Sequence, residues 1–200
     1  MTATGMPVTG VVCRGQRVEL GWPEPEEFDR LTALRNRPGV RERFLDSRLL
    51  DPVRNREWFA TGMRRPFEGV LAIRCEATLA GMIGWSGWDP EARTVELGRV
   101  IVDPAAARRL RGCFPANYAG IALDAGTALR DLLFEALDVQ CMRTVHLADN
   151  ALAIRASATG GGIVVSRHDV RRADGARVEV VEMTLTREAW RCLRAQRAAA

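Results

Sequence analysis

The chain contains no lysine, and all 29 of its basic residues are arginine. Because arginine stays protonated near neutral pH, these side chains can bind phosphate but cannot serve as general bases. Histidine is also scarce, with only His146 and His168. The five cysteines are scattered and form no Cys-x-x-Cys pair. The sequence therefore predicts neither a disulfide framework nor a metal site.

Long hydrophobic runs are missing as well. Runs such as residues 69–73 are far too short to span a bilayer, so we expect no membrane partner. The N-terminus lacks a basic segment followed by a long apolar stretch, which argues against a secretory signal. We expect residues 1–14 to be a disordered tail. Scattered, unpaired cysteines are typical of reduced thiols, so the expected location is the cytoplasm.

The charge balance is mild. Twenty-nine basic and 25 acidic residues give a net charge of +4 over 200 residues, and no aromatic–basic motif is present, so nucleic-acid binding is not favoured. Hydrophobic residues make up 47% and charged residues 27% of this 22.1 kDa chain, as in soluble globular proteins. The length suits one domain, which we expect over residues 15–200.

The hydrophobic pattern of the first half predicts two helices followed by strands. Phe28, Leu31 and Leu34 recur at helical spacing behind a proline-rich start. The expected elements are a short strand at 18–22, helices at 23–36 and 52–63, and an antiparallel meander of strands at 69–74, 80–88 and 94–102.

The second half contains the clearest helix of the chain, at 119–137, with one apolar face. An irregular arginine-rich loop is expected before it. The Asp174-Gly175 pair predicts a hairpin turn, and the chain after Arg187 is expected to be helical. The remaining expected elements are a strand at 142–147, a short helix at 150–159, and hairpin strands at 163–167 and 178–185.

Four short motifs accompany this order of elements. They are Glu96-Leu97-Gly98 on the third meander strand, the arginine- and glycine-containing loop before the long helix, Asn150-Ala151-Leu152-Ala153-Ile154-Arg155 after the next strand, and the upstream pair Leu34-Arg35-Asn36 and Glu57-Trp58-Phe59. Together they resemble the GNAT superfamily of acyl-CoA-dependent N-acyltransferases over residues 18–185. The likeness is to the branch that holds ribosomal-protein N-terminal and amino-sugar N-acetyltransferases.

The resemblance implies an α/β fold of the α+β type, in which one mixed, mostly antiparallel sheet with flanking helices splays open. The opening would lie between the strands at 94–102 and 142–147 and would hold acetyl-CoA or another acyl-CoA. The exposed backbone of Val100, Ile101 and Val102 would pair with the pantetheine amides, as an added strand would. An ordinary buried strand is the alternative at this position.

The resemblance also implies a pyrophosphate site at the start of the long helix, where backbone N–H groups and the helix dipole favour an anion. The family loop Arg/Gln-x-x-Gly-x-Gly/Ala corresponds here to residues 109–114, with Phe114 in place of the last small residue. Either Arg111 and Gly112 reach the phosphates, with Arg109 adding charge, or other amides bind them. Those other amides belong to Asn117, Tyr118, Ala119 and Gly120.

Asn150 and Ala153 match the start of the short helix that holds the pantetheine arm in the family. Asn150 also suits the N-cap of that helix, and both roles are compatible.

The catalytic residues implied are Glu96, His146 and Ser157. Glu96 matches a glutamate that takes the amine proton, although it could instead orient a neighbour or bind an ammonium group. His146 is the second candidate base, with a structural role as the alternative. Ser157 occupies the position of a tyrosine general acid in many members. Serine is a poor acid, so we expect water or the amine itself to protonate the thiolate.

The acceptor is expected to be a primary amine on a small molecule, such as an amino sugar or a natural-product intermediate, bound by a monomer or homodimer. Arg35 and Trp58 of the upstream motifs and Trp85, Ser86 and Trp88 beside Glu96 are the candidate pocket residues. A protein N-terminus is the alternative acceptor. A non-catalytic CoA-binding module on the same fold is the alternative function.

Overall fold

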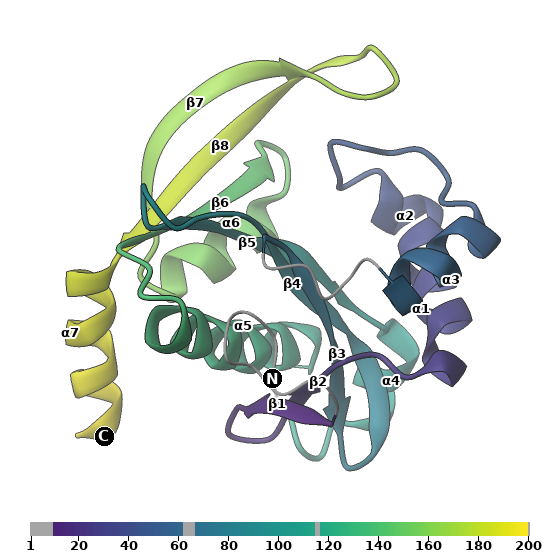
Figure 1. The fold of residues 1–200 in the computed structure, drawn as a ribbon, viewed down its shortest axis with the longest axis horizontal. Helices are drawn as coiled ribbons and strands as arrows, with labels where there is room; N and C mark the ends of the chain where they lie inside the picture. Colours follow the sequence, from purple (N-terminus) through teal and green to yellow (C-terminus); the bar gives the residue numbers. More distant parts are fainter. Residues whose placement is uncertain (1–9, 62–66, 115–116, 200) are drawn as a thin grey trace.

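One eight-stranded mixed sheet forms the centre of the fold (Figure 1). The computed structural model describes residues 10–61, 67–114 and 117–199, except for the side chains of Asn117 and Tyr118. The strand order is β1-β2-β3-β4-β5-β6-β8-β7. The strands are β1 (Val11–Arg14), β2 (Glu19–Gly21), β3 (Gly69–Cys75), β4 (Thr78–Asp89), β5 (Thr94–Val102), β6 (Cys141–Leu147), β7 (Ile163–Arg171) and β8 (Arg177–Thr186). The predicted fold class, including the meander β3-β4-β5, is confirmed.

Helices precede the meander, separate β5 from β6 and β6 from β7, and end the described chain. They are η1 (Pro25–Glu27), α1 (Phe28–Asn36), α2 (Pro38–Arg41), α3 (Pro52–Thr61), α4 (Pro104–Arg109), α5 (Asn117–Ala136), α6 (Ala151–Thr159) and α7 (Arg187–Ala198). The last two residues of the predicted 52–63 helix lie outside the described part of the chain. The other helices that the hydrophobic periodicity predicts are present, with shifted ends.

Two sequence-based expectations are wrong. Val11–Arg14 is not part of a disordered tail: it forms β1 and pairs with β2, and Val12 and Cys13 pack against the core. The expected irregular loop after β5 instead begins with helix α4. Asp103 caps that helix by accepting from the backbone N–H of Ala105 at 3.0 Å, and Pro104 occupies its first turn. Caps and proline at the first position start helices even when the helix is short.

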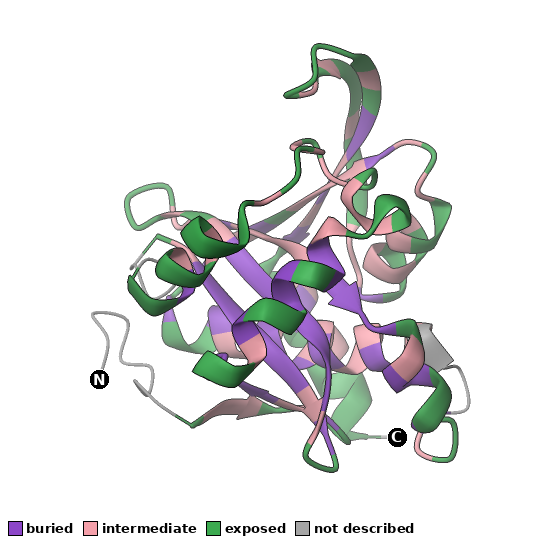
Figure 2. Cartoon of the chain, turned by 90° about the vertical axis from the view of Figure 1, so that its right-hand side faces the viewer, coloured by how far each residue is buried: buried purple, intermediate pink, exposed green. Residues whose placement is uncertain are grey.

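Helices cover both faces of the sheet (Figures 1 and 2). On one face, α1 and α3 pack together through Phe28 and Phe59, whose rings stack at 5.0 Å. On the opposite face, α5 packs against β4 and β5. Figure 2 shows the buried central strands behind the helices of the first face. Because these strands are covered on both faces, their sequences read as nearly continuous apolar runs.

The sheet opens between β5 and β6. These parallel strands pair only at their first residues, Thr94 with Cys141, Val95 with Met142 and Glu96 with Arg143. Beyond Glu96, β5 has no strand neighbour on that side among the described residues, while β6 continues with β8. The opening therefore begins beside Glu96, where the resemblance implies a split sheet.

The β7–β8 hairpin extends past this opening. Figure 1 shows it arching from the edge of the sheet toward the α1–α3 side. At its tip, the backbone N–H of Ala173 donates to the Leu45 carbonyl at 3.3 Å, and the Ser47 hydroxyl donates to Asp174 at 3.0 Å. The hairpin tip thus contacts the segment between α2 and α3.

Candidate active site

A cavity of about 1020 Å³ occupies the opening of the sheet. Strand alternation places Ser86, Glu96 and Arg74 on the same face of the sheet. This is the face that α1 covers, because Arg74 forms an ion pair with Glu27 of η1, the residue before α1. Leu97 points to the other face, where Ala122 of α5 also lines the cavity. The cavity therefore reaches both faces of the sheet through the gap between β5 and β6.

A β-bulge shapes the β5 edge of the cavity. Gly84 pairs with Gly98 and Met82 pairs with Ile101, so β5 has one residue more than β4 in this interval. Arg99, within the bulge, has a φ of 56°, an uncommon value for a residue other than glycine. Bulges bend a strand and re-aim its groups. The bulge lies on the part of β5 that β6 leaves unpaired, so it leaves main-chain groups available to a ligand.

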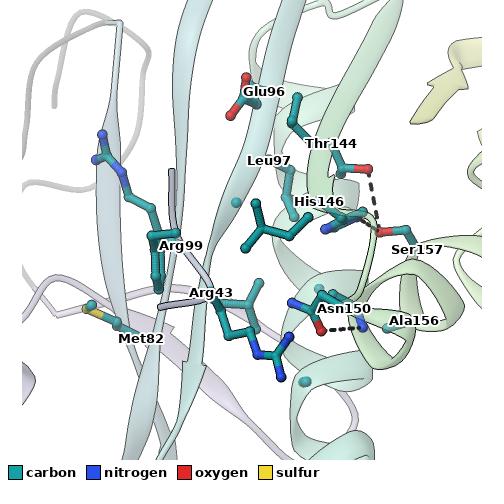
Figure 3. Close-up of a pocket in the computed structure, with 18 of the residues that line it drawn as sticks. Arg43, Met82, Glu96, Leu97, Arg99, Thr144, His146, Asn150, Ala156 and Ser157 are labelled. Atoms are coloured by element: carbon teal, nitrogen blue, oxygen red, sulfur yellow. Dashed lines mark hydrogen bonds between the residues drawn. The ribbon is translucent and has the colours of Figure 1, made fainter. Parts of the chain in front are cut away.

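Glu96 stands where the two strands part (Figure 3). Burial raises the pKa of its carboxyl group, and Glu182 raises it further, while Arg143 and Arg99 oppose this shift. A carboxylate in this environment is a stronger base than an exposed glutamate. Its position and basicity suit proton abstraction from a bound ammonium group.

His146 and Thr144 of β6 both contact Ser157 of α6. His146 Nε2 lies 2.7 Å from Ser157 Oγ, and Thr144 Oγ1 lies 3.5 Å from the same oxygen (Figure 3). The two strand residues are two positions apart, so their side chains share one face of β6. Burial lowers the pKa of His146, which favours the neutral imidazole. The histidine therefore has a defined partner rather than a free position in the cavity.

Ten of the predicted site residues line this one cavity. They are Arg35, Trp58, Ser86, Glu96, Val100, Ala119, His146, Asn150, Ala153 and Ser157. These residues come from α1, α3, three strands (β4, β5 and β6), α5, and α6 with its N-cap, so the fold brings together what the sequence keeps far apart. Asn150 also caps α6, since its side chain accepts from the backbone N–H of Ala153 at 3.3 Å.

Trp85 and Trp88 do not form the cavity wall that the sequence predicts. Trp85 is buried on the opposite face of β4, with its ring centroid 6.1 Å from that of Trp22. The register between β4 and β5 shifts after Ser86, and Gly87 has a φ of 61°. This irregularity ends the simple alternation that would have placed Trp88 on the side of Ser86.

The predicted pyrophosphate residues lie in the segment before α5 and in the first turn of α5. Arg109, Arg111 and Gly112 are exposed and do not line the cavity. Ile101 and Val102 are buried in the core, and Gly120 does not line the cavity either. The side chains of Asn117 and Tyr118 lie outside the described part of the structure, although both residues belong to α5.

The sequence did not indicate several cavity residues. Thr144 lies two positions before His146, so strand alternation could have identified it. Arg99 carried no local signal, because a bulge depends on the register with β4. On α5, residues 119, 122, 123, 126 and 130 form one cavity-facing stripe; Ala119 was predicted, and the helical spacing of the other four is a signal that the sequence contains. Arg130 of this stripe donates to the Gly160 carbonyl at 3.0 Å.

Neither a metal site nor a membrane-spanning helix is found among the described residues. No group of three or more histidine, cysteine, aspartate or glutamate side chains is placed to hold a metal ion. None of the described helices combines the length and apolarity needed to cross a membrane.

The sequence matches no protein-family model and no curated protein. Solved structures do match the fold. The ribosomal L7/L12 α-N-protein acetyltransferase RimL, solved with coenzyme A, has a TM-score of 0.73 at 12% identity, covering 90% of this chain and 99% of that one. A GCN5-related N-acetyltransferase from Brucella melitensis has a TM-score of 0.73 at 15% identity, covering 96% and 86%.

The spermidine N-acetyltransferase of Vibrio cholerae, solved with coenzyme A and spermine, has a TM-score of 0.69 at 14% identity. The match covers 87% of this chain and 98% of that chain. These similarities extend over nearly the whole length of each protein, and the split sheet with its bulged strand is seen in this structure independently of them. The chain therefore has the fold of the GNAT acetyltransferases, as the sequence motifs indicated.

Proposed function

We propose that this protein is an N-acetyltransferase that transfers an acetyl group, or a similar short acyl group, from acyl-CoA to a primary amine of a small molecule. The observation that carries the proposal is the position of Glu96. A carboxylate with a raised pKa stands at the point where β5 loses its neighbour strand, inside a cavity that reaches both faces of the sheet. The known proteins with the same fold support the reaction class.

The cavity suits an acyl-CoA. A Cβ atom built on Gly126 of α5 would meet nothing within 4 Å, so open space adjoins this helix on its cavity side. The free β5 edge offers main-chain groups to amides, as a neighbouring strand would. Asn150 and Ala153 would hold the pantetheine arm. The first turn of α5 would receive the phosphates, with Arg109 and Arg111 near its start in sequence.

Acyl-CoA would supply an activated thioester: the amine nitrogen bonds to the acyl carbon, the C–S bond breaks, and the CoA thiolate takes a proton from water or from the amine. Glu96 takes a proton from the ammonium form of the acceptor, directly or through water, which frees the nitrogen lone pair. Backbone N–H groups on the free β5 edge polarise the acyl carbonyl, because donors fixed in place stabilise the developing negative charge without reorganising. His146 and Thr144 hold the Ser157 hydroxyl in a fixed position.

The enclosed acceptor side favours a small molecule. The contacts of Ala173 with Leu45 and of Ser47 with Asp174 join the hairpin tip to the segment between α2 and α3. Leu45 and Asp46 of that segment line the cavity. A bridge at this position limits the width of any acceptor, so a compact amine suits the site better than a folded protein with a thick N-terminal segment.

Replacement of Ser157 by alanine is expected to slow acyl transfer by less than about tenfold, or about 1.4 kcal/mol. A serine hydroxyl is much less acidic than a CoA thiol, so it gains little by protonating the departing thiolate. The measurement is single-turnover transfer at saturating acyl-CoA. A loss of a hundredfold or more with unchanged CoA affinity would show that Ser157, held by His146, acts as an acid or positions one.

The proposed function is tested in two steps. Calorimetry with acetyl-CoA is expected to show binding, and hydrogen exchange is expected to show protection of β5 and the first turns of α5. A thiol-release assay across a panel of primary amines is then expected to find turnover. Binding without turnover of any amine would favour the non-catalytic CoA-binding module. No binding would overturn the proposal.

A further inference from the structure

Two of the arginines that line the cavity, Arg35 and Arg99, lie on its acceptor side, and each has a buried side-chain nitrogen without a hydrogen-bond partner among the described residues, as does Arg130 of α5 on the other face of the sheet. Arg35 of α1 is 7% exposed, yet its buried Nη1 has no partner within the described part of the chain. The buried Nη1 of Arg99, on the β5 bulge, is also unpartnered there. Buried guanidinium N–H groups are normally satisfied, so these two donors need an explanation.

The other donors of both side chains hold the guanidinium groups in place. Arg35 Nη2 donates to the backbone carbonyl of Asp46, and its guanidinium lies 3.9 Å from the centre of the Phe44 ring. Arg99 Nη2 donates to Glu68 at 2.8 Å, and its guanidinium lies 5.6 Å from the Trp58 ring. Rigid, ring-stacked guanidinium groups lose little entropy when a ligand binds.

Together with Glu68 and the Asp46–Arg48 pair, Arg35 and Arg99 leave a surplus of about one positive charge, while the charge of Glu96, which also interacts with Arg99, is matched by the ammonium group of the acceptor. Glu68 offsets Arg99, while the Asp46 carboxylate is held by Arg48 at 2.7 and 2.8 Å rather than by Arg35. Burial lowers the pKa of Arg35, the charge of Asp46 opposes this shift, and the nearby charge of Arg99 adds to it. One added monoanion would offset this surplus, whereas a dianion would exceed it.

From these contacts, and resting on the proposed function, we infer that the acceptor is an amine that also carries a carboxylate. Arg35 and Arg99 bind the carboxylate through their unpartnered Nη1 groups, while Glu96 faces the amine. Phe44 and Trp58, on which the two guanidinium groups stack, and Leu50 give the space between them apolar walls. The substrate class is therefore an amino acid or an amino-carboxylate with a compact apolar body.

The test compares matched acceptors that differ only in this anionic group. Thiol release from acetyl-CoA is measured with aromatic and aliphatic amino-carboxylates, with the corresponding amides, and with O-phosphorylated amino alcohols. In the wild-type protein we expect kcat/KM to be at least tenfold higher for the acids than for the amides. Equal rates for acids and amides would overturn the inference while leaving the proposed function intact, and a preference for the phosphates would overturn the choice of carboxylate.

The variants Arg99→Gln and Arg35→Gln are expected to lower the acid-to-amide ratio of kcat/KM by about tenfold each. The ratio is used because Arg99 also affects the pKa of Glu96, and that effect is common to both acceptors. Arg56→Gln, which removes an exposed arginine of α3 paired with Asp29, is the matched control and should keep the ratio. Arg99→Lys should retain part of the preference, since it keeps the charge but loses the planar donor pair.

A binding measurement makes the inference independent of turnover. In the presence of CoA, 3-phenylpropanoate is expected to raise the melting temperature of the wild-type protein more than 3-phenylpropanamide does, and Arg99→Gln should abolish the difference. If Arg35→Gln does not fold because Arg35 is buried, the Arg99 variants decide the question. An acid-to-amide ratio unchanged in Arg99→Gln would overturn the role assigned to the pair.

Discussion

Glu96→Gln is expected to lower kcat by about 10²- to 10⁴-fold, the usual contribution of a general base. Glutamine keeps the size of the side chain and its hydrogen-bonding capacity but cannot accept a proton from the ammonium group. The measurement is the steady-state rate with the best acceptor of the amine panel at saturating acetyl-CoA. Affinity for acetyl-CoA should change little, because Glu96 lies at the β5–β6 junction rather than along the free edge.

The pH dependence of the rate provides a second readout of the same residue. The base works only when ionised, so activity falls as the pH drops through the pKa of Glu96, which burial has raised above that of an ordinary glutamate. Glu96→Gln should lose this acidic limb. Glu182→Gln is the matched control: Glu182 raises the pKa of Glu96, so its removal should move the limb to lower pH with little loss of rate. A wild-type profile in Glu96→Gln would exclude Glu96 as the base.

Gly126→Leu is expected to weaken acetyl-CoA binding by about a hundredfold or more, or about 2.7 kcal/mol. Gly126 belongs to the cavity-facing stripe of α5, and a Cβ atom there meets nothing within 4 Å, so a larger side chain fills ligand space rather than clashing with the fold. The measurement is calorimetric titration with acetyl-CoA alongside thermal unfolding.

The free energy of unfolding supplies the control for this substitution. Glycine inside a helix is unfavourable by roughly 0.5–1 kcal/mol relative to alanine. Gly126→Ala should therefore stabilise the protein slightly and bind acetyl-CoA nearly as well as wild type, and Gly126→Leu should be at least as stable as wild type. Undiminished acetyl-CoA affinity in Gly126→Leu would show that the ligand does not lie along α5.

Local sequence patterns predicted the helices and strands whose hydrophobic periodicity is visible within the element itself. The apolar stripe of α5 and the apolar and β-branched runs of β3, β4 and β5 can be recognised without knowing which other elements they contact. Helix α4 was missed because only a cap, a proline and three alanines define its six residues. Strand β1 was missed because four residues gain strand character only by pairing with β2.

The candidate site was predicted most directly where a family motif fixed the position. Glu96, Asn150 and Arg35 each lie in a motif, and all three line the cavity. Trp85 and Trp88 were misplaced because the register shift after Ser86 and the conformation of Gly87 depend on the pairing of two strands. The contact of His146 with Ser157 joins β6 to α6, and the spacing of the two residues along the chain does not predict it.

The short junction between β5 and β6 divides the main-chain hydrogen bonding into two blocks, β1–β5 and β6–β8, joined in the sheet by three residue pairs. Each block is a continuous antiparallel ladder, so backbone bonds resist separation within a block far more than between the two. A ligand seated in the gap touches both blocks and binds only when they are correctly spaced. Such a ligand stabilises the native state by RT ln(1 + [L]/Kd), so if acyl-CoA binds there as proposed, the free energy of unfolding rises with the acyl-CoA concentration.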